Sequence, residues 1–162
     1  MRVGFGYDVH VLVESRPLVL GGVTVPFHLG LDGHSDADVV VHAIMDALLG
    51  AAALGDIGIH FPPGDPAYKD ASSIGLLVRV RDLLAAQGYE PGNVDAVIVA
   101  QQPKLSPYFF EMRRRIGEAL AIGVDRVSVK ATTSEGLGFV GRGEGMVAQA
   151  VATIVRLGSE IG

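Results

Sequence analysis

Three side chains in the first part of the chain, Asp8, His10 and His42, are of the types that bind a divalent metal ion. In an extended segment, residues two apart project from the same face, so a strand over residues 4–10 presents Asp8 and His10 together. A helix that starts near Ser35 would aim His42 back at this strand. Three Asp and His ligands leave one coordination position open, which is typical of a catalytic zinc site. Because Asp and His are also common in turns and caps, spacing alone does not decide between a metal site and ordinary polar side chains.

A glycine-rich segment over residues 130–145 carries groups that suit phosphate oxygens. It follows a predicted strand and offers the Thr133 hydroxyl, backbone amides and the cations Lys130 and Arg142. Glu135 would repel a phosphate unless a cation lay between them, which favours a bridging Mg²⁺. A tight turn at a subunit contact is the alternative explanation for these glycines, and composition alone leaves it open.

Within this segment, Gly136, Gly138 and Gly141 match the glycine pattern of dinucleotide-binding proteins. Only about twenty residues follow, and they leave no room for the next strand with its ribose-binding acid, so we reject this interpretation. No Gly-Lys-Ser or Gly-Lys-Thr occurs, and a Walker A loop is excluded as well.

The chain has 162 residues, which predicts a single domain over residues 1–162. Hydrophobic residues make up 49% and charged residues 19%, which favours burial of one face in a homo-oligomer. The formal net charge of −5 argues against nucleic acid as a partner. The chain has no cysteine, no signal-peptide pattern and no long apolar run, so we expect a cytoplasmic enzyme that does not bind a membrane.

Hydrophobic periodicity and turn residues predict the secondary structure. We expect strands over residues 2–10, 94–100 and 126–131, a hairpin over 17–20 and 23–26, and helices over 35–53, 72–87, 107–120 and 143–157. The Gly- and Pro-rich loop 55–66 is expected to act as a lid over the substrate. Ser35 would cap the first helix, and Asp38 is expected to orient the His42 imidazole. This order predicts an α+β fold with one mixed β-sheet and helices packed on one face.

Over essentially its whole length the chain resembles the 2-C-methyl-D-erythritol 2,4-cyclodiphosphate synthase family of the non-mevalonate isoprenoid pathway. The motifs that carry the resemblance are Asp8-Val9-His10, His34-Ser35-Asp36 with Asp38 and His42, Ala47 to Gly58, Lys130 to Glu135, Gly138-Phe139 and Gly141 to Gly145.

The resemblance implies Zn²⁺ on Asp8, His10 and His42, with a substrate phosphate in the open position. It implies that His34 and Thr133 are catalytic and hold the transferring phosphate, and that Glu135 faces Mg²⁺ or Mn²⁺ on the substrate diphosphate. The substrate-binding residues that it implies are Asp8, His10, His34, Ser35, Asp56, Gly58, Phe61, Asp65, Ala100, Pro103, Lys104, Leu105, Ser106, Thr132, Thr133, Glu135, Phe139 and Arg142.

Similar proteins are homotrimers with active sites between subunits, so the resemblance implies a homotrimer here. Phe139, Arg142 and Glu144 resemble the lining of a central cavity that holds an isoprenoid diphosphate in some relatives. The chain departs from the family pattern at Pro63-Gly64, where Asp-Thr is usual, and at Ser106, where an apolar residue is common.

The implied reaction is that of a phosphorus–oxygen lyase. The 2-phosphate of 4-diphosphocytidyl-2-C-methyl-D-erythritol 2-phosphate attacks the β-phosphorus of the same molecule and releases CMP. Two other functions fit parts of the sequence. A zinc hydrolase would use a metal-bound water as its nucleophile. A trimeric binding protein for isoprenoid diphosphates would use Arg142 but leave Asp8, His10 and His42 without a role.

Overall fold

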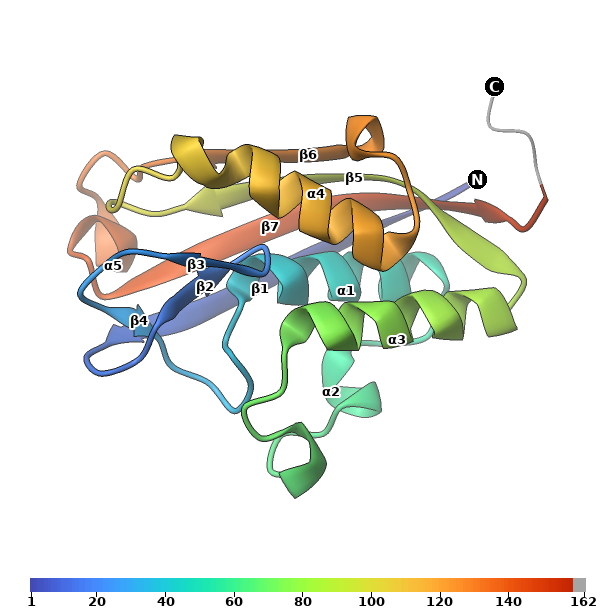
Figure 1. Ribbon diagram of the computed structural model, residues 1–162, viewed down its shortest axis with the longest axis horizontal. Coiled ribbons are helices and arrows are strands. Elements are labelled where there is room, and N and C mark those ends of the chain that lie inside the picture. Colours follow the sequence, from blue (N-terminus) through green and yellow to red (C-terminus); the bar gives the residue numbers. More distant parts are fainter. Residues whose placement is uncertain (159–162) are drawn as a thin grey trace.

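A five-stranded mixed sheet runs the length of the molecule in the computed structural model, which describes residues 1–158 (Figure 1). The strand order is β4-β1-β7-β5-β6. Only the pair β5–β6 is parallel; the other neighbours are antiparallel. The strands are β1 (Arg2–Val13), β4 (Gly30–Leu31), β5 (Tyr89–Val99), β6 (Val127–Thr132) and β7 (Gly145–Arg156).

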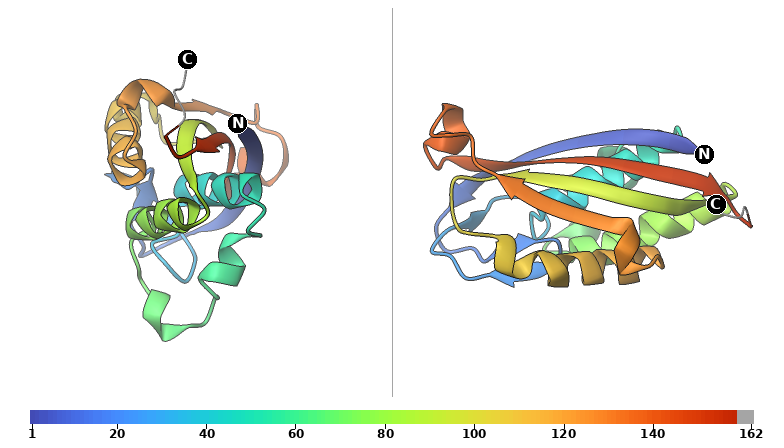
Figure 2. Two further views of the ribbon diagram at one scale, coloured as in Figure 1. Left: turned by 90° about the vertical axis from the view of Figure 1, so that its right-hand side faces the viewer. Right: turned by 90° about the horizontal axis from the view of Figure 1, so that it is seen from above.

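Three long helices cover one face of this sheet, as both views in Figure 2 show. They are α1 (Val39–Ala51), α3 (Ser73–Ala86) and α4 (Phe109–Leu120). The α+β fold with a mixed sheet and helices on one face is therefore confirmed. The smaller elements are α2 (Ile57–His60), α5 (Gly138–Gly141), the hairpin β2 (Leu18–Leu20) with β3 (Val23–Val25), and single 3₁₀ turns at Pro66–Tyr68, Ser106–Tyr108 and Val124–Arg126.

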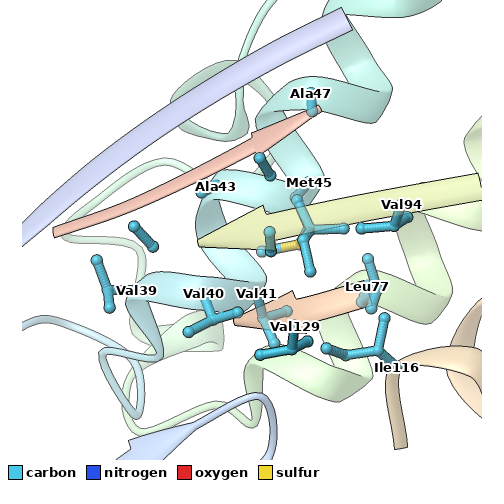
Figure 3. Close-up of a cluster of buried hydrophobic side chains, with 14 of the residues drawn as sticks. Val39, Val40, Val41, Ala43, Met45, Ala47, Leu77, Val94, Ile116 and Val129 are labelled. Carbon is cyan, nitrogen blue, oxygen red and sulfur yellow. The ribbon is translucent and has the colours of Figure 1, made fainter. Parts of the chain in front are cut away.

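The hydrophobic core lies between the sheet and the helices. In Figure 3, Met45 of α1 lies beside Val94 of β5 and Leu77 of α3, and Ile116 of α4 lies next to Leu77. Met45, Leu77 and Ile116 are fully buried. Helix α1 is apolar on nearly every side, since it is enclosed by the sheet and by α3.

Helix α1 lies unusually close to β1 because two glycines face it. A Cβ on Gly6 would stand 1.9 Å from the carbonyl oxygen of Ala43, and a Cβ on Gly4 would stand 1.9 Å from that of Ala47. The even-numbered residues of β1 therefore point at α1, and the next two in this row are Asp8 and His10.

The odd-numbered residues of β1 form an apolar strip on the opposite face of the sheet. No helix of the described residues covers this face (Figure 2). Its side chains are between 42% and 61% exposed: Val3, Phe5, Tyr7, Val9 and Val11. Such a continuous apolar surface is typical of a protein–protein interface.

The helix predicted over residues 143–157 is wrong, because this segment is strand β7. Its burial alternates, and it is hydrogen-bonded between β1 and β5 at the centre of the sheet. Alanines at 148, 150 and 152 mimic a helical composition, but small side chains are needed here because α1 packs directly above β7. Tertiary packing thus overrides helix propensity.

The first helix begins later than predicted. Ala37 has a positive φ of 56°, which ends any helical path from Ser35. The cap is Asp38, whose carboxylate accepts the Val41 N–H, and α1 starts at Val39. The remaining predicted strands and helices are present, with ends shifted by a few residues, and the loop 55–66 contains α2 and the start of a 3₁₀ turn.

Within residues 1–158, the helices are all too short or too polar to cross a lipid bilayer.

Candidate active site

The side chains of Asp8, His10 and His42 converge between β1 and α1. Asp8 Oδ2 lies 3.0 Å from His10 Nε2 and 3.0 Å from His42 Nδ1, and these two nitrogens are 3.2 Å apart. The prediction that these three side chains converge is therefore confirmed. Strand alternation places Asp8 and His10 on the side of β1 that faces α1. Among the residues that the structure describes, this is the one group of three or more candidate ligands close enough to share an ion.

The hydrogen bonds around the two imidazoles leave one nitrogen of each ring for a cation. His10 Nδ1 lies 2.7 Å from the carbonyl oxygen of Asp32, which can only accept, so Nδ1 carries a proton and Nε2 faces the cluster. His42 presents Nδ1 to the cluster and Nε2 to buried hydroxyls. Two ring nitrogens and a carboxylate oxygen facing one point form a donor set that suits Zn²⁺.

The cluster is arranged to keep Asp8 ionised. Burial would raise the pKa of the Asp8 carboxyl, but the His10 and His42 imidazoles beside the carboxylate outweigh it and lower that pKa to about 2. Burial would lower the pKa of His10, yet the hydrogen bond and charge of Asp8 raise it above 6.5. The carboxylate is therefore available as a ligand at neutral pH, and a proton on His10 Nε2 would compete with a metal ion.

Asp38 does not orient His42, contrary to the sequence-based prediction. Its carboxylate accepts the backbone N–H groups of Gly21 and Gly22 at 2.9 and 2.6 Å, besides that of Val41. Asp38 is completely buried, and this burial raises its pKa to about 6. It therefore joins the β2–β3 turn to the start of α1. The carboxylate behind His42 belongs to Asp36, which reaches the imidazole through the Ser73 hydroxyl.

A cavity of about 230 Å³ opens beside the three candidate ligands. It collects four of the predicted substrate-binding residues, His34, Ser35, Gly58 and Phe61, in addition to Asp8, His10 and His42. Its lining residues are Asp8, His10, His34, Ser35, His42, Met45, Ile57, Gly58, Phe61, Pro63, Tyr68 and Leu76. Pro63, one of the positions at which the chain departs from the family pattern, also lines this cavity.

The loop that carries α2 is anchored to the wall of this cavity. Asp46 of α1 accepts the N–H of Ile57 at 2.8 Å, and Asp56 caps α2 by accepting the N–H of Ile59. Burial raises the pKa of Asp46 against the effect of that N–H bond. His34, which also lines the cavity, has its Nε2 atom 2.9 Å from the carbonyl oxygen of Asp65.

Arg16 fixes the segment that carries His34 and Ser35. Its guanidinium donates to the carbonyl oxygens of Gly33 and Ser35 at 2.9 and 2.7 Å. Sequence reasoning missed Arg16, Asp46 and Ser73, because each acts through a backbone or side-chain contact between distant segments that no local pattern reveals.

A second cavity, of about 470 Å³, holds most of the remaining predicted residues. It lies where β5 and β6 end and is a different cavity from that beside the metal ligands. Its lining residues are Ala100, Gln101, Gln102, Pro103, Lys104, Leu105, Ser106, Phe109, Ala131, Thr132 and Thr133. The described chain thus gathers most of the predicted site residues in two separate places.

The charged residues of the glycine-rich segment make local contacts. Glu135 comes two residues after Thr133, which lines this cavity. The φ angle of Glu135 is positive, 53°, and its carboxylate accepts a hydrogen bond from the Thr133 hydroxyl at 3.3 Å. Lys130, expected to face phosphate, pairs with Asp95 across the sheet. Arg142 pairs with Glu144 at 2.7 Å. Phe139 lies in α5, three residues before Arg142 in the sequence, and is 39% exposed.

Comparison with known proteins assigns the chain to a family. The model of the YgbB family matches residues 1–155. The chain belongs to the YgbB family. A relative from Pelotomaculum thermopropionicum named 2-C-methyl-D-erythritol 2,4-cyclodiphosphate synthase is 63% identical over 158 residues, which cover 98% of both chains. One of the same name from Symbiobacterium thermophilum is 62% identical over 95% of this chain and 98% of its own. The resemblance found in the sequence is confirmed.

Solved structures of YgbB relatives share the fold. A structure of 2C-methyl-D-erythritol-2,4-cyclodiphosphate synthase in a CDP-bound form has a TM-score of 0.87 and 35% identity, over 95% of this chain and 100% of its own. The bifunctional IspDF from Campylobacter jejuni has a TM-score of 0.93 and 42% identity over 96% of this chain. The match covers 42% of that longer protein.

Proposed function

We propose that this chain is a metal-dependent 2-C-methyl-D-erythritol 2,4-cyclodiphosphate synthase, in one catalytic domain over residues 1–162 and in the cytoplasm. The observation that carries the proposal is the convergence of Asp8, His10 and His42 beside a cavity that contains His34. The names of the relatives support the reaction, and the CDP-bound form of one related structure supports a cytidine diphosphate substrate.

The proposed reaction is an intramolecular phosphoryl transfer. An oxygen of the 2-phosphate forms a bond to the β-phosphorus of the diphosphocytidyl arm of 4-diphosphocytidyl-2-C-methyl-D-erythritol 2-phosphate. The bond from this phosphorus to the bridging oxygen breaks, and its electron pair leaves on CMP. Because the nucleophile is already anionic, no general base is required. Positioning and charge neutralisation therefore account for catalysis.

Asp8, His10 and His42 would hold Zn²⁺, and Glu135 would face Mg²⁺ or Mn²⁺ on the diphosphate. These ions supply positive charge next to the phosphoryl oxygens. His34, in the metal cavity, and Thr133, in the second cavity, are proposed to hold the transferring phosphate. The erythritol part of the substrate would bind to backbone carbonyls and amides of the α2 loop and to Ser35, Asp56, Gly58, Phe61 and Asp65.

The cytidine end is proposed to lie in the second cavity, against Ala100, Pro103, Lys104, Leu105, Ser106 and Thr132. One substrate must then contact two places that lie apart on a single chain. The arrangement is resolved if the second cavity of one subunit adjoins the metal cavity of another, and the exposed apolar strip on β1 gives such subunits a surface to share.

We therefore propose a homotrimer with active sites between subunits. Phe139 and Arg142 would line its central cavity, where an isoprenoid diphosphate could place its apolar chain and its anionic end. Arg142 already forms an ion pair with Glu144 in the described chain.

The direct test is turnover of the cytidine substrate by the purified protein, loaded with Zn²⁺ and Mg²⁺ and followed by ³¹P NMR. We expect CMP and a cyclic diphosphate. His42→Ala should lose bound zinc and this activity together, whereas the control His28→Ala, at an exposed histidine outside the metal cavity, should keep both. Full turnover by a zinc-free His42→Ala protein would refute the metal assignment.

A further inference from the structure

Two hydroxyl groups contact the imidazole of His42 on the side away from the candidate metal site. His42 Nε2 lies 3.0 Å from Ser73 Oγ and 3.2 Å from Ser35 Oγ. The exposed fractions of His42 and Ser35 are 8% each, and Ser73 is fully buried. Because so little solvent reaches this place, His42 Nε2 must find its hydrogen-bond partner among these hydroxyls.

The proton of the Ser73 hydroxyl is already committed to Asp36. Ser73 Oγ donates to Asp36 Oδ1, and the backbone N–H of Ser73 donates to Asp36 Oδ2 at 2.9 Å. An ionised carboxylate can only accept hydrogen bonds. Ser73 Oγ therefore has only lone pairs left for His42, and a hydrogen bond between them requires the proton to be on Nε2.

The opposite tautomer would place the proton on Nδ1, where Asp8 Oδ2 lies 3.0 Å away and can accept it. Nε2 would then face Ser73 Oγ with lone pair against lone pair at 3.0 Å, and its remaining donor would be the more distant Ser35 hydroxyl at 3.2 Å. That tautomer would also occupy with a proton the nitrogen that points toward His10 and Asp8, so it opposes metal binding.

We propose that Asp36 and Ser73 are positioning residues that hold His42 as its Nε2–H tautomer and keep the Nδ1 lone pair directed at the metal site. A carboxylate that acts on a metal-binding histidine in this way fixes the ring and makes it a better donor. Here the carboxylate acts through one intervening hydroxyl. The inference rests on the metal assignment made above but not on the reaction.

The first experiment needs no variant. Two-bond ¹H–¹⁵N spectra of the metal-free, ¹⁵N-histidine-labelled protein at pH 8 distinguish the two neutral tautomers of each ring. The His42 signals, identified by their loss in His42→Ala, should show the proton on Nε2. A proton on Nδ1 in the unmodified chain would overturn the proposal.

The decisive variant is Asp36→Asn, which keeps the size of the side chain. It keeps the shorter backbone contact, from the Ser73 N–H at 2.9 Å, and gives up the longer one, from the Asp38 N–H to Asp36 Oδ1 at 3.3 Å. The amide Nδ2 of asparagine cannot face the Ser73 N–H, a donor 2.9 Å from Asp36 Oδ2, so it must face Ser73 Oγ. The freed Ser73 proton can then be donated to His42 Nε2. We expect the His42 tautomer to shift toward Nδ1–H and zinc affinity to fall about 10- to 100-fold.

Ser73→Ala removes the acceptor itself and should weaken zinc binding by a similar factor. Its matched control is Ser72→Ala, because the neighbouring Ser72 hydroxyl makes no cap hydrogen bond to α3; tautomer and affinity should stay unchanged there. If Ser73→Ala does not fold, Asp36→Asn alone decides. A folded Asp36→Asn protein with the original tautomer and affinity would overturn the proposal.

These measurements use zinc and no substrate, so they separate this inference from the proposed reaction. A shifted tautomer in Asp36→Asn supports the inference even if the cytidine substrate is not turned over. Normal turnover by the unmodified protein together with an unaffected Asp36→Asn protein would refute the inference alone.

Discussion

Gly6 of β1 lies directly against the carbonyl oxygen of Ala43 in α1, so close that a Cβ on Gly6 would stand 1.9 Å from this oxygen. His42 is the neighbour of Ala43, and Asp8 is the next residue along the same face of β1. The distance between strand and helix that brings the three candidate ligands together is therefore set by the absence of a side chain at Gly6.

We expect Gly6→Ala to lower the free energy of unfolding by about 3 kcal/mol or more, because backbone must move to admit the methyl group. Bound zinc should fall with it. The control is Gly75→Ala on the exposed side of α3, where a Cβ meets nothing within 4 Å. That change should stabilise the protein by about 0.5–1 kcal/mol. Denaturant unfolding of both variants checks the pair, and equal stabilities would contradict the close-packing argument.

Zinc affinity should depend on pH in a defined direction. The pKa of His10 is raised by Asp8, so below that pKa a proton occupies the nitrogen that faces the cluster. A single competing proton makes affinity fall about tenfold for each unit of decreasing pH. Competition titration with a chromogenic chelator from pH 8.5 to 6 would measure this slope. A flat profile would contradict the role of His10.

The stability of the metal-free protein should also depend on pH, through the two groups His10 and Asp8. The raised pKa of His10 contributes stability that is present below pH 6.5 and lost as the pH rises through the pKa of the folded state. The lowered pKa of Asp8 contributes stability above pH 3.8 that is lost as the pH falls toward 2. We therefore expect this pair to stabilise the metal-free protein most between about pH 4 and 6.5.

Asp46 should affect substrate binding more than zinc binding, since its carboxylate holds the α2 loop through the Ile57 N–H. Asp46→Ala removes this acceptor and should raise KM about fivefold, the equivalent of one hydrogen bond of about 1 kcal/mol. Asp46→Asn keeps an oxygen for Ile57 and should restore KM. If both variants behave alike in steady-state kinetics, the anchoring role is wrong.

The proposed trimer can be tested by replacing two exposed phenylalanines that lie in different surroundings. Phe5 lies in the apolar strip of β1 and is 61% exposed, whereas Phe110 on α4 is 66% exposed. Phe5→Glu should convert the trimer to monomers and abolish turnover, because a charge would be buried between subunits. Phe110→Glu should remain trimeric and active. Light scattering coupled to size-exclusion chromatography gives the masses; a monomeric wild type would refute the assembly.

The candidate metal ligands could be predicted from sequence because few elements position them. Strand alternation alone pairs Asp8 with His10, and one helix then supplies His42. Ser73 could not be found in this way, since a serine at the start of a helix is normally a cap and its contact with His42 depends on how α1 packs on α3. Its neighbour Asp36 carries no local signal either.

The error at β7 has a similar origin. An alanine-rich segment favours a helix in isolation, and only the close approach of α1 explains why strand β7 has small residues on its buried face. The separation of the second cavity from the metal cavity could not be predicted from the sequence either, because it depends on where β5 and β6 end relative to β1.

The origin of the nucleophile tests the central claim most directly. The proposed cyclisation uses an oxygen of the substrate itself, whereas a zinc hydrolase would use water. The reaction should therefore be run in H₂¹⁸O and its products analysed by mass spectrometry. We predict a cyclic diphosphate and CMP that both lack ¹⁸O. An open-chain product with ¹⁸O on phosphorus would contradict the account and identify the metal site as hydrolytic.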